Sequence, residues 1–357
     1  MVNIDIIQTE NSRLGQVNFD NLGFGKIFSD HMFIAEYKDG RWQNFKIGPV
    51  HNFSVHPANM TFHYGQGIFE GLKASKNEDG TPILFRPEQN ASRLNHSARR
   101  LCMPEFPEDI FLEGLKKLVS LDRDWIPTFE GSSLYIRPFM IATDEFLGVS
   151  PSATYKMVII TCPSGPYYAK PVRLFADDYY VRASIGGTGE AKCAGNYAGA
   201  LYPTKLAKDK GFDQILWLDA IYHKYIQEVG TMNIFFVTKD RKILTPITDG
   251  AILRGVTRDS IMTILADRGY TVEERLISID EIIHEYEKGN LLEVFGAGTA
   301  AVVTNVAAIT YKDKTMEFEE SAWELSLSMK KYINDLRGGK VEDKYNFTIK
   351  VDQLVHA

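Results

Sequence analysis

The sequence predicts an α/β protein built from two domains. Its 357 residues, 44% of them hydrophobic, exceed the roughly 150 residues that one domain commonly needs. Strand-like apolar runs and helix-like apolar stripes occur in both halves. Between the halves, the stretch "CPSGPYYAKP" (Cys162–Pro171) holds three prolines and a glycine after the apolar run "KMVIIT", as an interdomain connection would. We therefore predict an N-terminal domain over 1–163, a linker over 164–171 and a C-terminal domain over 172–357.

The clearest helix in the first half follows Pro87. Ala91, Leu94, Ala98 and Leu101 recur at three- and four-residue spacing, which is the apolar stripe of a helix packed on a core. A proline at the first helical position is well tolerated. We expect this helix to begin at the proline.

The second half contains short apolar runs and helix signals. The runs "QILWL", "NIFFV" and "LLEVF" suit buried strands. Two further helices are predicted from capping-box patterns and from glycines placed where each should stop; the positions are Ser278 with Glu281 and Gly289, and Ser321 with Glu324 and Gly338. Pro203 falls inside the helix expected after Tyr197, so this helix should start late or bend.

Charge and cysteine content exclude several classes of protein. The net charge is -6, with 40 basic and 46 acidic residues, so no basic surface for nucleic acid or anionic lipid is indicated. The three cysteines, Cys102, Cys162 and Cys193, are far apart, which indicates neither a disulfide framework nor a zinc site. No signal peptide or apolar run near 18 residues is present. We expect a protein of the reducing cytoplasm.

One stretch, "GGTGEAKCAGNY" (Gly186–Tyr197), places Lys192 among small residues. Small flanking residues let another molecule approach the backbone, so this lysine suggests a ligand. A nucleotide phosphate is disfavoured, because Ala191 and Cys193 stand where a phosphate-binding loop needs glycine and a hydroxyl. The dinucleotide pattern G-x-G-x-x-G is also absent from this window.

A glutamate before an apolar run is the second candidate functional residue. Glu228, in "QEVGTMNIFFV", lies at the entry to an apolar run. Such a carboxylate either bonds to loop amides or meets a cation, and for a lone glutamate the first reading is the commoner. Together, Lys192 and Glu228 are the pair that pyridoxal phosphate requires: an amine for the Schiff base and an acid that keeps the pyridine nitrogen protonated.

Several motifs at this point resemble one family, the branched-chain amino acid aminotransferases. In the second half they are "KCAGNYAGALYPTKLAKDKGFDQILWLD", "EVGTMNIF", "GAILRGVTRDSI" and "EVFGAGTAAVV". In the first half they are "FGKIFSDHMF", "FHYGQGIFEGLKA", "LFRPEQNASRLNHSARRL" and "SLYIRP". The resemblance covers nearly the whole chain. It implies a two-domain pyridoxal phosphate enzyme of fold type IV, with mixed sheets and flanking helices in both domains, as in D-amino acid aminotransferase.

The resemblance implies a role for each matching residue at the cofactor. Lys192 forms the Schiff base and carries the proton between the substrate Cα and the cofactor. Glu228 faces the pyridine nitrogen, and Tyr197 bonds to the phenolic oxygen of the ring. The remaining cofactor contacts that it implies are Arg93, Thr231, Val256, Thr257 and Thr299. Of these, "GVTRDSI" has the character of a helix start, whose N–H groups favour an anion.

The same resemblance implies which residues bind the substrate. Phe24, Tyr64 and Tyr135 line the side-chain pocket, and aromatic walls suit a branched apolar chain. The backbone N–H groups of Thr299 and Ala300 meet the α-carboxylate. Arg137, two residues after Tyr135, would point to the same face of an extended strand. It either grips the distal carboxylate of glutamate or 2-oxoglutarate or forms a structural ion pair.

The function implied is reversible, ping-pong transfer of the amino group of leucine, isoleucine or valine to 2-oxoglutarate by a homodimer. Three alternative functions stay open: a D-amino acid aminotransferase, an aminodeoxychorismate lyase, and a binding protein that keeps the fold without turnover.

The sequence departs from the mammalian relatives at one place, their redox-active C-x-x-C after the Gly-Thr-Ala turn. Ala301 and Thr304 occupy those places here, so no thiol switch is predicted. Cys193 is expected to be a small buried hydrophobe.

Overall fold

The computed structural model describes residues 3–166 and 170–353. The chain forms two compact units. The first comprises Met1–Tyr167, Ala191–Ala194 and Asn334–Ala357, and the second comprises Tyr168–Glu190 and Gly195–Ile333. The predicted linker, 164–171, includes residues 167–169, which lie outside the described residues. The two units differ from the predicted domains, because the Lys192 segment and the C-terminal residues pair with strands of the first unit.

The first unit is built on a nine-stranded mixed sheet in the order β1-β3-β2-β8-β7-β5-β6-β18, with β4 paired to β7. The strands are β1 Asp5–Ile6, β2 His31–Lys38, β3 Arg41–Pro49, β4 Gly67–Phe69, β5 Leu72–Lys76, β6 Pro82–Phe85, β7 Ser133–Ala142, β8 Tyr155–Ser164 and β18 Thr348–Lys350. The longest pairing joins β7 and β8 in antiparallel register, from Ser133 opposite Ser164 to Ala142 opposite Tyr155. β7 therefore lies at the middle of the sheet and carries Tyr135 and Arg137.

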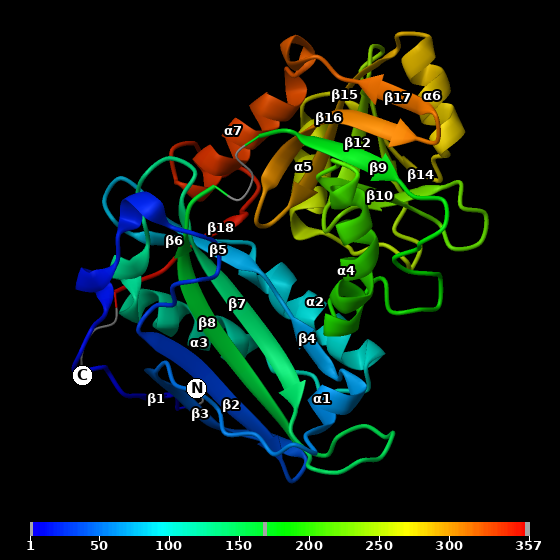
Figure 1. Ribbon diagram of the computed structural model, residues 1–357. Coiled ribbons are helices and arrows are strands. Elements are labelled where there is room, and N and C mark those ends of the chain that lie inside the picture. Colours follow the sequence, from blue (N-terminus) through cyan, green and yellow to red (C-terminus); the bar gives the residue numbers. More distant parts are fainter. Residues whose placement is uncertain (1–2, 167–169, 354–357) are drawn as a thin grey trace. The chain divides into compact units, whose positions relative to one another are not determined.

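Two long helices cover one face of this sheet (Figure 1). The helices of the unit are α1 Met60–Tyr64, α2 Pro87–Arg100 and α3 Glu108–Leu121, with short 3-10 turns at Leu14–Gln16, Phe19–Asn21 and Arg123–Trp125. α2 begins at its proline and buries Ala91, Leu94 and Ala98, which confirms the predicted stripe. An acidic residue in its first turn and two arginines in its last turn complement the helix dipole.

The second unit has another nine-stranded mixed sheet, in the order β11-β10-β9-β16-β15-β12-β13-β14, with β17 paired to β16. The strands are β9 Val172–Ala176, β10 Gln214–Leu218, β11 Ile226–Val229, β12 Asn233–Thr238, β13 Lys242–Pro246, β14 Thr271–Arg275, β15 Leu291–Gly298, β16 Val302–Tyr311 and β17 Lys314–Glu317. The three predicted strands are confirmed as β10, β12 and β15. All six residues of β12 are buried, as expected for a central strand covered on both faces.

The helices of the second unit are α4 Ala194–Asp209, α5 Val256–Asp267 and α6 Ile279–Glu287, with a 3-10 turn at Glu320–Ala322. α7 Leu325–Arg337 leads from the second unit into the first. The predicted cap of α6 is confirmed: Ser278 Oγ accepts from Glu281 N at 3.1 Å, and Gly289 follows the helix with φ 66°. A late start of α4 is wrong, because the helix runs from Ala194 with Pro203 inside it.

The predicted cap of α7 by Ser321 is also wrong. Ser321 lies in the 3-10 turn, and the helix begins at Leu325. Its cap comes from a strand instead. The buried carboxylate of Glu293, on β15, accepts from the backbone N–H groups of Glu324 at 3.0 Å, Leu325 at 2.8 Å and Ser326 at 2.9 Å. A carboxylate at this place satisfies the free donors of the first turn and matches the helix dipole.

We expect Glu293→Ala to lower the free energy of unfolding by about 1–3 kcal/mol, because it leaves buried N–H groups without an acceptor. Urea unfolding followed by circular dichroism would measure the change. Glu319→Ala, at an exposed position just before the 3-10 turn, is the matched control and should leave the midpoint unchanged. Equal midpoints for the two variants would show that the cap contributes nothing to stability.

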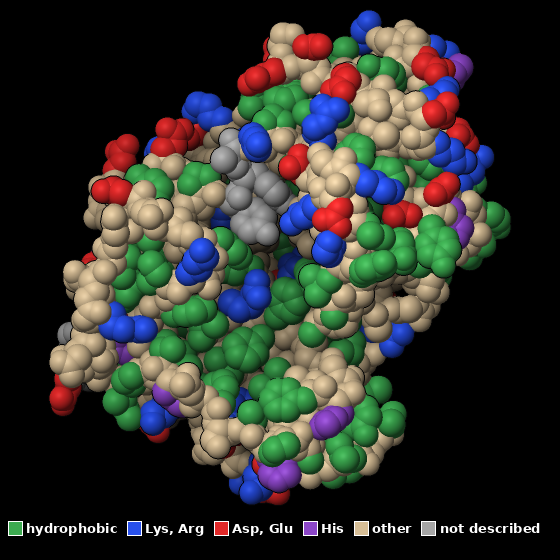
Figure 2. Space-filling model, viewed as in Figure 1, with side chains coloured by type: hydrophobic (Ala, Val, Ile, Leu, Met, Phe, Trp, Pro, Cys, Tyr) green, Lys and Arg blue, Asp and Glu red, His purple; other side chains and the backbone are tan. Residues whose placement is uncertain are grey.

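Charged side chains of both signs are interspersed on the face shown in Figure 2, in keeping with the net charge of -6. All three cysteines are free thiols, and Cys193 is buried, as expected. Within residues 3–166 and 170–353, no helix combines the length and the apolar character that a membrane crossing requires.

Candidate active site

The backbone of Lys192 is held from two sides within the first unit. Its N–H donates to Ser97 Oγ, on α2, at 2.9 Å, and its carbonyl accepts from Phe69 N, on β4, at 3.0 Å. The next residue, Cys193, forms a β-bridge with Ile68. The lysine therefore stands at a fixed place beside the sheet although its own segment is irregular.

The side chain of Lys192 lies over an aromatic ring that a second cation shares. Lys192 Nζ is 5.0 Å from the centroid of Phe69, and Arg137 Cζ is 4.6 Å from the same centroid. Cations favour the negative face of such a ring. Phe69 thus brings a primary amine and a guanidinium together at one place in the first unit.

Arg137 is also tied to the predicted aromatic wall. Its Nη2 donates to the Tyr135 hydroxyl at 3.0 Å, as expected for residues two apart on one strand. The Tyr135 ring meets the Phe24 ring edge-on at 4.8 Å between centroids. Tyr64 lies at the end of α1, 40% exposed, with His63 as its ring neighbour at 6.2 Å. The structure thus links Phe24, Tyr135 and Arg137 into one surface next to Phe69.

Arg93 takes part in a buried ion pair that the sequence did not predict. Its Nε and Nη2 donate to the two carboxylate oxygens of Glu70 at 2.7 and 2.8 Å. Glu70 is fully buried and also accepts from Asn90 Nδ2 at 2.8 Å. Burial disfavours the charged carboxylate, but the positive charges of Arg93 and Lys192 hold the pKa of Glu70 below its usual value. The pair fixes the guanidinium of Arg93 on the buried side of α2.

In the second unit, Glu228 is buried and receives several donors. Its Oε1 accepts from Asn233 Nδ2 at 3.2 Å and from Leu253 N at 3.1 Å. Its Oε2 lies 2.7 Å from Arg182 Nη2. The cation and the two further donors all stabilise the charged form of this buried carboxylate, which is the form that would pair with a protonated ring nitrogen.

A tight turn sets the positions of Glu228 and Asn233. β11 and β12 are joined by Gly230, Thr231 and Met232, and Val229 and Met232 exchange backbone hydrogen bonds of 2.8 and 2.9 Å across the turn. Gly230 has φ 52°, a left-handed conformation that favours glycine, and a Cβ there would press on the end of the Gln214 side chain. Thr231 is exposed at the tip of the turn.

The start of α5 offers backbone donors. Its N-cap is Gly255, which provides no side-chain cap, so the first N–H groups, including those of Val256 and Thr257, are left for an anion. A Cβ on Gly255 would overlap the Asn233 amide. This close approach places the helix start beside the residues that hold Glu228.

The other predicted contacts lie at element ends. Thr299 and Ala300 belong to the tight turn between β15 and β16, and Val302 follows with φ 62°. Tyr197 lies in the first turn of α4. Its neighbour Asn196 bonds to the Thr188 side chain at 2.6 Å and to the Thr188 carbonyl at 2.7 Å, which ties α4 to the glycine-rich stretch before Lys192.

The predicted residues fall into two groups, one in each unit. The first holds an amine, an arginine in an ion pair and aromatic side chains; the second holds a buried carboxylate and an open helix start. An aldehyde carbon, a phosphate and a protonated ring nitrogen have matching groups among them, so the residues fit pyridoxal phosphate. Sequence reasoning missed the buried Glu70 and Ser97 and the half-buried Phe69 and Arg182. Phe69 and Glu70 occur inside the motif "FHYGQGIFEGLKA", which was the available signal.

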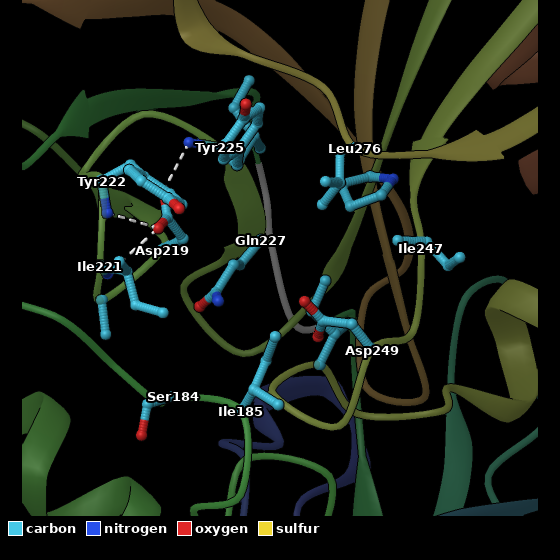
Figure 3. Close-up of a pocket in the computed structure, with 14 residues that line it drawn as sticks. Ser184, Ile185, Asp219, Ile221, Tyr222, Tyr225, Gln227, Ile247, Asp249 and Leu276 are labelled. Carbon is cyan, nitrogen blue, oxygen red and sulfur yellow. Dashed lines mark hydrogen bonds between the residues drawn. The ribbon is translucent and has the colours of Figure 1, made fainter.

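The second unit also has an apolar pocket of about 100 Å³ that contains none of the predicted residues. Figure 3 shows Gln227 at its centre, among Ile185, Ile221, Tyr222 and Leu276. Gln227 precedes Glu228 on β11, and successive side chains of a strand point to opposite faces. The side chain of Gln227 in this pocket therefore points to the face of β11 opposite to that of Glu228.

The chain is similar in sequence to a known protein family and to named relatives. A family model described as class IV amino-transferase matches residues 67–309. A Bacillus subtilis protein named branched-chain-amino-acid aminotransferase 2 is 47% identical over 343 residues, covering 95% of this chain and 94% of that protein. A branched-chain-amino-acid aminotransferase from Mycolicibacterium smegmatis is 41% identical and covers 93% of both chains.

Solved structures give the same picture of the fold. A branched-chain amino acid aminotransferase from Escherichia coli matches with a TM-score of 0.73 and 25% identity, covering 90% of this chain and 99% of that one. A T.th. branched-chain amino acid aminotransferase in complex with N-(5'-phosphopyridoxyl)-L-glutamate matches with a TM-score of 0.71 and 26% identity, covering 89% and 98%. These similarities confirm the α/β fold with two mixed sheets that the sequence motifs implied.

Proposed function

Because the chain belongs to the class IV aminotransferases, and within them to the branched-chain amino acid aminotransferases, we propose that it transfers amino groups from leucine, isoleucine and valine to 2-oxoglutarate. Pyridoxal 5'-phosphate is its cofactor. The reaction is reversible and runs as a ping-pong cycle of two half-reactions. The observation that carries this proposal is the shared ring of Phe69, where Lys192 and Arg137 lie beside an aromatic surface.

When bound, pyridoxal phosphate supplies an aldehyde carbon and a ring that withdraws electrons. We assign two roles to Lys192 Nζ: it would hold the cofactor at its aldehyde carbon, and it would move a proton at the substrate Cα. Glu228 holds the proton of the ring nitrogen. In this proposal, the phosphate is held by Arg93, Val256, Thr257 and Thr299. Tyr197 binds the ring oxygen, and Thr231 is a further cofactor contact.

The substrate residues divide into an apolar and a charged set. Phe24, Tyr64 and Tyr135 surround the branched side chain and exclude water from it. The N–H groups of Thr299 and Ala300 bind the α-carboxylate. Arg137 recognises the distal carboxylate of glutamate or 2-oxoglutarate. Support for a dicarboxylate comes from the T.th. relative, whose structure contains a phosphopyridoxyl adduct of L-glutamate.

Steady-state assays separate this function from its rivals. With 2-oxoglutarate as acceptor, we expect kcat/KM for L-leucine, L-isoleucine and L-valine to exceed that for the D-enantiomers and for aminodeoxychorismate by orders of magnitude. Gel filtration of the holoenzyme tests the proposed homodimer. Turnover of D-amino acids at equal or higher rates would favour the D-amino acid aminotransferase instead.

We expect Arg137→Met to slow the glutamate half-reaction by the equivalent of about 1.5–3 kcal/mol, because it removes a charge-assisted contact. The leucine half-reaction should lose little, since leucine has no distal charge. Single-turnover rates with each amino acid, followed by cofactor absorbance, would measure both. Arg99→Met is the control, because Arg99 pairs with Glu105 at the surface, with 55% and 50% of the side chains exposed. Equal losses for glutamate and leucine would make Arg137 a structural residue.

A further inference from the structure

We propose that Arg182 is a positioning residue that keeps Glu228 ionised and fixes the direction of its carboxylate toward the cofactor's ring nitrogen. The inference rests on the proposed role of Glu228 and adds a residue to it. Arg182 lies in the irregular segment after β9, 46 positions before Glu228 in the chain. No motif in the sequence associates the two residues.

The contact itself is short and enclosed. Arg182 Nη2 lies 2.7 Å from Glu228 Oε2, and only 9% of the arginine side chain and 5% of the glutamate side chain are exposed. Shielding from water strengthens the attraction between the two charges. It also makes each charge costly without the other. The pair therefore differs from the ion pairs at the surface of this unit, which water screens.

Arg182 is itself held in place by two backbone carbonyls. Its Nη2 donates to the carbonyls of Ala251 at 2.6 Å and Gly189 at 3.1 Å. Gly189 packs so closely on Ala251 that a Cβ would overlap the Ala251 carbonyl. This contact gives one reason for a glycine in the stretch before Lys192: the chain's own backbone approaches there.

The same loop holds the other member of the pair. Leu253, two residues after Ala251, donates its N–H to Glu228 Oε1 at 3.1 Å and accepts from Asn233 Nδ2 at 2.9 Å. Residues 251–253 thus bind the arginine by a carbonyl and the glutamate by an N–H. The carboxylate has one oxygen toward Arg182 and the other toward Leu253 and Asn233, so its plane is fixed by three separate segments.

The charge of Arg182 affects where a proton shared between Glu228 and the cofactor would reside. A buried carboxylate tends to take up a proton, and a neighbouring cation opposes that tendency. Arg182 contacts Glu228 directly, whereas it would act on a ring nitrogen held by Glu228 only through the carboxylate. The arginine therefore disfavours a proton on Glu228 more than a proton on the nitrogen. The shared proton then stays on the nitrogen, where the ring withdraws electrons best.

The test compares the protonation of the ring nitrogen in Arg182→Gln and Arg182→Lys. Glutamine can still bond to the Ala251 carbonyl but has no charge, whereas lysine keeps the charge. Each protein is loaded with pyridoxal phosphate carrying ¹⁵N in the ring, and the ¹⁵N shift is recorded without substrate. We expect Arg182→Gln to shift toward the unprotonated value and Arg182→Lys to stay close to wild type. Proton removal from leucine should slow by about 10- to 100-fold in Arg182→Gln alone.

A matched control is Arg173→Met. Arg173 pairs with Glu317 at 2.7 and 3.0 Å, but about half of each side chain is exposed, so its loss should leave the ¹⁵N shift unchanged. A wild-type shift in cofactor-loaded Arg182→Gln would overturn the inference. A more strongly protonated nitrogen would overturn it as well.

A double variant keeps the test decisive if Arg182→Gln fails to fold, because Arg182→Gln with Glu228→Gln leaves neither charge buried alone. If Arg182 acts through Glu228, adding Arg182→Gln to Glu228→Gln changes the ¹⁵N shift no further, and a further change refutes the inference. Failure of the proposed function is separate: it would appear in the wild-type protein, as no bound cofactor or no transamination of branched-chain amino acids.

Discussion

Lys192→Ala should abolish nearly all transamination while the protein stays folded. The substitution removes both the amine that we propose links to the cofactor and the base that moves the proton at the substrate Cα. Loss of the proton transfer alone costs roughly 10²–10⁴-fold in rate, and loss of covalent capture adds to it. The visible absorbance that the lysine link gives to the cofactor should disappear. Steady-state assays with leucine and 2-oxoglutarate and an absorbance spectrum of the loaded protein would measure both effects.

The fold should survive because the segment of Lys192 is held in place by its backbone. The backbone contacts to Ser97 and Phe69 do not involve the side chain, so alanine can keep them. Lys205→Ala on α4 is the control, because Lys205 is 69% exposed and pairs only along its own helix with Asp209. Undiminished turnover by Lys192→Ala would refute the mechanism, whereas loss in both variants would point to damage elsewhere.

The sequence predicted those elements whose signals are local. α2 was predictable because its proline, its apolar stripe and its terminal charges lie within one segment. The same is true of α6, whose cap Ser278 is three residues from its partner Glu281. The start of α7 was not predictable in this way. Its cap is Glu293, which lies more than thirty positions earlier on a strand, and no local pattern distinguishes it from any other glutamate.

The same distinction applies to the candidate site. Lys192 and Glu228 were found because their neighbours are unusual, small around the one and strand-like around the other. Their partners are ordinary charged residues of the sequence. Glu70 becomes significant only when α2 brings Arg93 to it, and Arg182 only when the loop at Ala251 encloses it. Residue types suggested the chemistry that we propose, but the groups that contact these residues depend on the tertiary structure.

Both groups of predicted residues contain a buried pair of opposite charges. Each contains a buried carboxylate paired with one arginine, Glu70 with Arg93 and Glu228 with Arg182. Neither pair is explained well by stability alone, because desolvation offsets most of the attraction between buried charges. Two such pairs would supply fixed charges to the charged cofactor that we propose binds here.

Glu228→Gln should slow turnover by about 10²-fold or more while the cofactor stays bound. Glutamine keeps the shape and can still accept from Leu253 N, but it has no charge to stabilise a proton on the ring nitrogen. The ring then withdraws electrons poorly when the Cα proton leaves, and preorganised charge of this kind is commonly worth roughly 10²–10³-fold. The contacts proposed for the phosphate, at Arg93, Val256 and Thr257, are unchanged. Affinity for the cofactor should therefore fall much less than kcat.

Rates and binding must be measured on the same preparation. Single-turnover reaction with leucine gives the proton-transfer step, and equilibrium titration of the apoprotein with pyridoxal phosphate gives the affinity. The primary isotope effect with Cα-deuterated leucine should rise in Glu228→Gln, because proton removal becomes more rate-limiting. Glu317→Gln, which removes an exposed carboxylate of the same unit, should match wild type in all three measurements. Wild-type turnover by cofactor-loaded Glu228→Gln would mean that the ring nitrogen takes its proton from another group, and Arg182 would then have no catalytic charge to position.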